Sequence, residues 1–143
     1  MNEDTINLLK ECNAGCKSAT NSMEQVKPYI KNDTFKNMID DYNAKHISIG
    51  DKCHQLLNES NEEEKDPSSM AKAFSWLTTE MKLMANDDTK KIAEVMYDGC
   101  QMGIKSVSQY INQYKTASDE SKILSNSLVQ IEQDFMKDLL EYL

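Results

Sequence analysis

Arginine is absent from this chain of 143 residues, and lysine supplies every basic side chain. Acidic residues outnumber lysines by 24 to 16, which gives a net charge of −8 at pH 7. A nucleic-acid-binding surface needs a basic face and commonly uses the guanidinium fork of arginine. The composition therefore argues against a nucleic-acid partner, and also against bidentate recognition of phosphate or carboxylate groups.

Long apolar runs are missing as well, since no stretch approaches the ~20 residues that a membrane-spanning helix requires. The N-terminal sequence MNEDTINLLKE is acidic and amphipathic, so it does not have the basic and then apolar pattern of a signal peptide. We therefore expect a cytoplasmic protein with no membrane partner, whose four cysteines stay reduced. The abundance of lysine and asparagine without arginine is typical of an AT-rich bacterial genome.

Glycine and proline are scarce, with four and two residues, and this favours helices over sheets. Apolar residues recur in steps of three and four over five segments, at residues 4–30, 34–59, 69–85, 90–114 and 120–142. Helices of about 25 residues span about 37 Å. We predict a single all-α domain over residues 1–143, a four-helix bundle of two antiparallel helix hairpins with a shorter connecting helix.

The two hairpins look like related halves. The segment NAGCKSA in the first helix aligns with YDGCQMG in the fourth at an offset of 84 residues, which pairs Cys16 with Cys100 and Gly15 with Gly99. Inward positions of the first helix also align with inward positions of the fourth. The pattern predicts an internal pseudo-symmetry, with these glycines where paired helices or a bound group approach the backbone.

The chain resembles the ferritin-like superfamily. The resemblance rests on the two long hairpins and on the segments TINLLKECNAGCK, KHISIGDKCHQLL, FSWLTTEMKLMANDDTKKI and YDGCQMGIKSVSQY. Within that superfamily it is most similar to an uncharacterised family of bacterial ferritin-like domains. The resemblance implies a ferritin-like bundle with a connection that crosses between the hairpins.

A ferritin-like metal centre takes one carboxylate from each of two helices and a Glu-x-x-His motif from each of the other two. By resemblance, the two carboxylate positions correspond to Cys16 and Cys100. The motif of the second helix corresponds to Asn43 and His46, so its histidine is present and its glutamate is absent. The fifth helix has no histidine, and its candidate ligands are Gln130, Gln133 and Asp134. The resemblance therefore implies a degenerate centre without di-iron chemistry.

Cys16, His46 and Cys100 lie on inward faces of the predicted bundle. Thiolate and imidazole ligands suit Zn(II) or Cu(I), so these three residues are the candidate metal ligands, with Cys12 or Cys53 as a further ligand. The alternative is that the cysteines fill the core, since free cysteine is among the most buried residue types. A third interpretation is a disulfide between Cys16 and Cys100.

The remaining features do not indicate catalysis. No Gly-rich phosphate loop and no nucleophile motif is present. We expect His46 to be a core histidine hydrogen-bonded near Tyr42, and His54 to be exposed. The functional prediction is a non-catalytic ferritin-like bundle with a structural, assembly or stress-related role, without a cofactor, acting as a homodimer or with a protein partner. The alternative is a metal-handling or thiol-redox protein that binds Zn or Cu through Cys16, His46 and Cys100.

Overall fold

The computed structural model describes residues 1–65 and 88–143. These residues form α-helices and short 3-10 helices, and within them there is no β-strand, as the sequence predicts. The helix expected at 69–85 lies outside the described residues. The elements are α1 (Glu3–Val26), η1 (Lys27–Tyr29), α2 (Asp33–Glu59), α4 (Thr89–Gln113), α5 (Asp119–Leu139) and η2 (Leu140–Tyr142).

Side-chain caps fix where the long helices begin. Each of the four is preceded by a residue whose side-chain oxygen accepts a backbone N–H from the first turn, and such a cap satisfies a donor that has no partner within the helix. Pro28 lies in η1, directly after α1, where its ring disfavours a regular α-helix. The predicted boundaries hold to within a few residues. The capping residues are Asn2, Asn32, Asp88 and Ser118.

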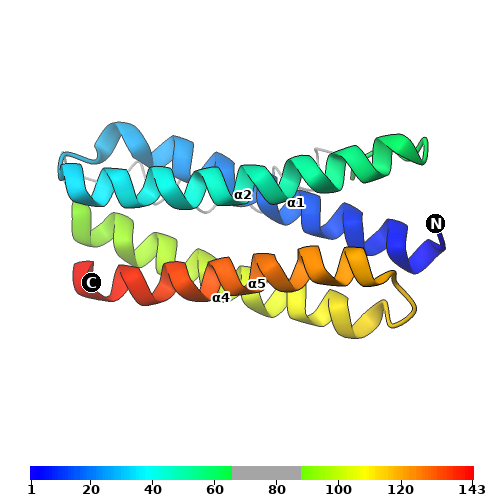
Figure 1. Ribbon diagram of the computed structural model, residues 1–143. Helices are drawn as coiled ribbons and strands as arrows, with labels where there is room; N and C mark the ends of the chain where they lie inside the picture. Colours follow the sequence, from blue (N-terminus) through cyan, green and yellow to red (C-terminus); the bar gives the residue numbers. More distant parts are fainter. Residues whose placement is uncertain (66–87) are drawn as a thin grey trace.

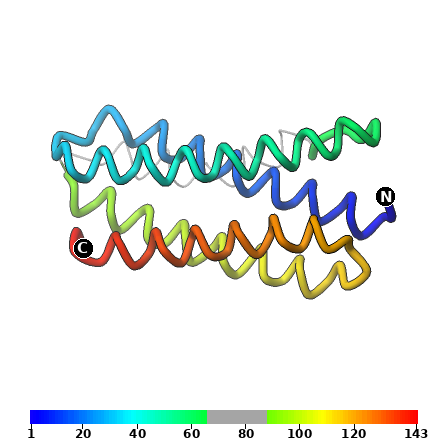
Figure 2. Tube along the Cα trace, viewed as in Figure 1, coloured from blue at the N-terminus to red at the C-terminus, as the bar shows by residue number. Residues whose placement is uncertain are grey.

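The helices pair as two antiparallel hairpins, α1 with α2 and α4 with α5 (Figure 1). α1 also contacts α4 and α5, and α2 contacts α5. Followed along the trace, α1 and α5 run in one direction while α2 and α4 run in the other (Figure 2). The last turn of α2 and the first turn of α4 therefore lie at opposite ends of the bundle.

The buried stripes of the four helices form two apolar clusters. One cluster contains Leu9, Cys12, Cys16, Ile49, Cys53, Leu57, Val107 and Leu128. The other includes Met23, Val26, Phe35, Ile39, Tyr42, Met96, Cys100, Phe135 and Leu139. On α2 and α5 the positions between the two clusters carry polar side chains, His46 and Glu132.

None of the helices within 1–65 and 88–143 is both long and apolar enough to cross a membrane.

The stripe on α5 differs from the predicted one. The apolar periodicity favours Leu124, Leu128, Ile131, Phe135 and Leu139 as inward residues, yet Leu124 and Ile131 are only half-buried. A buried serine can be accommodated because its hydroxyl donates to the preceding turn, as Ser125 Oγ does to the Ser121 carbonyl at 2.9 Å. The buried residues of α5 are Ser121, Ser125, Leu128, Glu132, Phe135 and Leu139.

The glycines do not all occupy close approaches between helices. A Cβ added at Gly99 would meet nothing within 4 Å, and one added at Gly15 would lie at an ordinary 3.5 Å from Leu128 Cδ2. The expectation of a close approach between paired helices is therefore wrong at both Gly-Cys positions, while both glycines border a cavity between α1 and α4. The tight place is Gly50, where an added Cβ would lie 3.1 Å from Cys16 Cβ.

Replacing Gly99 and Gly50 by alanine tests this difference. Both glycines lie inside helices without positive φ. Gly99→Ala should raise the free energy of unfolding by about 0.5–1 kcal/mol, because alanine is the better helix former. In Gly50→Ala the methyl group presses on Cys16, and overpacking typically costs about 1–3 kcal/mol. Urea denaturation followed by circular dichroism measures both, and an equal gain in the two variants would contradict the close approach.

Candidate functional site

A buried hydrogen bond between His46 of α2 and Glu132 of α5 lies at the centre of the bundle. His46 Nε2 is 2.8 Å from Glu132 Oε1, and His46 Nδ1 is 2.6 Å from the Tyr42 carbonyl oxygen. His46 is 0% exposed and Glu132 is 6% exposed. The predicted core position of His46 near Tyr42 is confirmed, and the contact is with the Tyr42 backbone.

The hydrogen bonds of His46 determine how many protons the pair holds. The Tyr42 carbonyl can only accept, so Nδ1 must carry a hydrogen. The bond to Glu132 then needs one further proton, either on Nε2 or on the carboxyl group. In both cases the pair as a whole is neutral. A neutral pair with its hydrogen bonds made is the form in which two titratable groups can be buried at moderate cost.

Cys100 of α4 approaches the same carboxylate. Burial raises the pKa of the Cys100 thiol, and the charge of Glu132 and the hydrogen bond to it raise that pKa further. The thiol is therefore protonated at neutral pH and donates to Glu132. On the side of α5, Phe135 stacks on Tyr42 at 4.5 Å between ring centroids and presents its edge to His46 at 6.5 Å.

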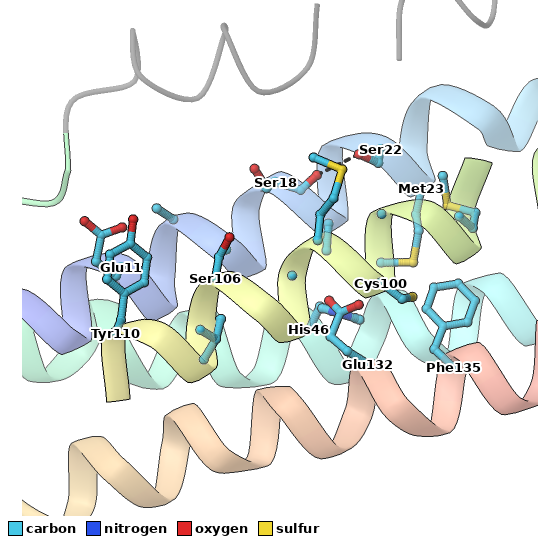
Figure 3. A pocket seen from close by; sticks show the side chains of 18 of the residues that line it. Glu11, Ser18, Ser22, Met23, His46, Cys100, Ser106, Tyr110, Glu132 and Phe135 are labelled. Atoms are coloured by element: carbon cyan, nitrogen blue, oxygen red, sulfur yellow. Dashed lines mark hydrogen bonds and ion pairs between the residues drawn. The ribbon is translucent and has the colours of Figure 1, made fainter. Parts of the chain in front are cut away.

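A cavity of about 260 Å³ opens between α1 and α4, with Glu132 and His46 bordering it (Figure 3). Small residues of α1 and α4 leave room for it, and an added Cβ at Gly103 would lie 3.5 Å from the Glu132 carboxyl carbon. Figure 3 shows Glu132 and His46 meeting beside Cys100, while Glu11 and Tyr110 lie further along the helices. The lining is mainly apolar away from this polar group.

Cys16 lies in a different environment from Cys100. It packs with Cys12 of its own helix and Cys53 of α2 in one buried cluster. Its hydrogen bond with Cys12, together with burial, raises the pKa of the Cys16 thiol. The hydrogen bond of Cys53 with Cys12, together with burial, likewise raises the pKa of the Cys53 thiol. The hydrogen bonds that Cys16 and Cys53 donate lower the pKa of Cys12. Cys12, Cys16 and Cys53 thus form one group of buried thiols.

The three candidate metal ligands are consequently divided between two places. His46 and Cys100 border the cavity between α1 and α4, whereas Cys16 borders a second cavity of about 450 Å³, beside α1 and α2, that His46 also reaches. Within residues 1–65 and 88–143, no group of three or more His, Cys, Asp or Glu side chains is arranged to hold a metal ion. The geometry does not assemble Cys16, His46 and Cys100 into one ligand set.

Glu132 is the site residue that the sequence reasoning missed. The buried positions of α5 follow steps of three and four, at residues 125, 128, 132, 135 and 139. A helical pattern that admits polar as well as apolar residues would therefore have identified Glu132 as an inward residue. The candidates Gln130, Gln133 and Asp134 are instead exposed, and Gln130 Nε2 donates to Asp134 Oδ1 at 2.9 Å on the surface. His54 is exposed, as predicted, and contacts Glu64.

Comparisons with protein-family models, with curated proteins and with solved structures found no match to this chain. Only the residues of the bundle itself therefore bear on its function.

The stability of the buried pair can be tested with His46→Leu, Glu132→Leu and the double variant. Each single change leaves a buried polar partner unpaired, which typically costs about 3–5 kcal/mol. The double variant should be clearly more stable than the sum of the single losses predicts, because it leaves neither partner behind.

Urea denaturation of the four proteins gives the coupling energy. Gln133→Leu, at the exposed neighbouring position, serves as the control and should change stability by no more than about 0.5 kcal/mol. Strictly additive losses would show that His46 and Glu132 do not depend on one another.

Proposed function

We propose that this chain is a non-catalytic ferritin-like bundle with a structural or assembly role, in which a hydrogen-bonded His–Glu pair stands where related bundles hold metal. The observation that carries the proposal is the contact between His46 and Glu132 in the centre of the four helices. While Nδ1 bonds the Tyr42 carbonyl oxygen and Nε2 bonds Glu132, neither ring nitrogen of His46 has a free electron pair with which to begin metal binding.

The positions of the two motifs support this proposal. A ferritin-like centre has a Glu-x-x-His pair on each of two helices. In α2 the corresponding pair is Asn43 and His46, and in α5 it is Glu132 and Phe135, all four of which are buried. Each helix thus retains one half of the motif, the histidine on α2 and the glutamate on α5. The two retained halves bond to each other.

The other two ligand positions favour the same conclusion. Cys16 of α1 and Cys100 of α4 replace the single carboxylates, so Glu132 is the carboxylate left at the centre. Two ferrous ions prefer several oxygen ligands, which this set does not supply. The helix directions agree with a ferritin-like chain path, since the end of α2 and the start of α4 lie at opposite ends of the bundle, as one long crossover requires.

A second candidate is a metal-handling protein that binds Zn or Cu through Cys16, His46 and Cys100. The observation that favours it is that His46 and Cys100 border the same cavity. This function would require His46 to release Glu132 and Cys16 to leave its contacts with Cys12 and Gly50. The first proposal needs no such rearrangement.

Elemental analysis distinguishes the two candidates. Protein purified anaerobically under reducing conditions should contain far less than one Zn, Cu or Fe per chain, and Cys16→Ser/Cys100→Ser should not change that content. A stoichiometric metal that this double variant loses would overturn the non-catalytic proposal and establish the second candidate.

A variant in which the missing metal ligands are restored provides a gain-of-function test beside the elemental analysis. Asn43→Glu and Phe135→His restore both Glu-x-x-His pairs, and Cys16→Glu and Cys100→Glu restore the single carboxylates. If the ferritin-like assignment is correct, the folded quadruple variant should bind about two Fe(II) or Co(II) ions per chain where the parent binds none. A folded variant without metal affinity would contradict the assignment of these positions.

Sedimentation of the parent chain tests the assembly role, since a monomer at high concentration would argue against a homodimer.

A further inference from the structure

Three thiols from two helices meet in the bundle half opposite to Cys100. Cys12 and Cys16 of α1 and Cys53 of α2 are each at most 1% exposed and belong to one cluster. All four cysteines of the chain are free thiols. Any two of the three clustered thiols are therefore candidates for a disulfide bond.

Helix geometry excludes a bond within α1. Cys12 and Cys16 are one turn apart, and Cβ atoms at this spacing are about 5–6 Å apart. A disulfide needs Cβ atoms about 3.5–4.5 Å apart. Their thiols can share a hydrogen bond, but a regular helix holds the Cβ atoms too far apart for an unstrained S–S bond.

The register of α1 against α2 brings Cys12 opposite Cys53. The Cβ that Gly50 lacks would lie 3.1 Å from Cys16 Cβ, so these two residues face each other across the hairpin. Cys12 lies one turn before Cys16 in α1, and Cys53 lies one turn after Gly50 in α2. Because the two helices are antiparallel, Cys12 and Cys53 are therefore the next pair of residues to face each other. The two helices lie side by side here (Figure 1), and both thiols are in the same cluster.

Cys100 has no such neighbour in the described part of the chain. It lies on α4 in the other apolar cluster and donates to Glu132. The Cys16–Cys100 disulfide that the internal repeat suggested would have to join residues that belong to separate clusters. The geometry favours a bond within the first hairpin.

We propose that Cys12 and Cys53 are a disulfide-forming pair that links α1 to α2 when the protein meets a small-molecule disulfide. Both thiols are buried, so the reaction begins when a local opening of the hairpin exposes one of them. Its thiolate attacks the oxidant, which forms a mixed disulfide and releases one thiolate. The second cysteine loses its proton to solvent and displaces the other half of the oxidant. Two protein thiols are oxidised to one S–S bond, and one small-molecule disulfide is reduced to two thiols. The inference does not depend on the ferritin-like assignment.

Oxidised glutathione is the probe for this proposal. Native protein is incubated with it to equilibrium, denatured, treated with an alkylating reagent and analysed by intact mass and peptide mapping. Two of the four thiols should escape alkylation, and a single cross-link should join the peptides that contain Cys12 and Cys53. The oxidised protein should also unfold at a higher urea concentration than the reduced protein, because the cross-link constrains the unfolded chain.

Single alanine variants separate the possible pairs. Cys12→Ala and Cys53→Ala should abolish the internal cross-link, whereas Cys100→Ala, checked for the same helical content, should retain it. Mapping of the unmodified chain needs no variant, so it identifies the cross-linked pair even if a variant fails to fold. Four alkylated thiols after oxidation, or a cross-link between Cys16 and Cys100 or between Cys16 and Cys53, would overturn it.

Discussion

The hydrogen bond between His46 and Glu132 is the constraint on which the arrangement of this bundle depends. It joins α2 of one hairpin to α5 of the other, at a place where His46 is fully buried and Glu132 is only 6% exposed. Because an unpaired polar group is costly there, the two helices must keep the register that brings these residues together. Apolar contacts alone tolerate sliding and repacking far better, so the polar pair gives the two hairpins a specific mutual position.

The helices could be predicted from the sequence because their signals are local. Caps such as Asn32 and Ser118 and the scarcity of glycine and proline fix element type and approximate boundaries without any tertiary information. Glu132 could not be predicted, because an apolar pattern places charged residues on the surface. Only its partner on another helix makes its burial favourable, and the pairing of residues 86 positions apart is a property of the fold.

The repeated Gly-Cys pair shows how a sequence symmetry can diverge in space. Cys16 and Cys100 occupy matching positions along α1 and α4, yet one joins a cluster of thiols and the other donates to a carboxylate. The reason lies in their neighbours, since Gly50 of α2 admits Cys16 while the carboxylate of Glu132 of α5 acts on Cys100. Alignment of the two halves predicted equivalent positions, but it could not predict what the opposite helix presents to each one.

Tyr42 and Glu132 hold the two ring nitrogens of His46, and we propose that no metal ion takes their place. Nitrogen-15 NMR of the two imidazole rings tests it most directly, with exposed His54 as the internal reference. We predict that Nδ1 of His46 carries a proton and that its signals stay unchanged when Zn(II) or a chelator is added. A His46 ring without a proton on Nδ1, or signals that shift with metal in the native protein, would contradict the account.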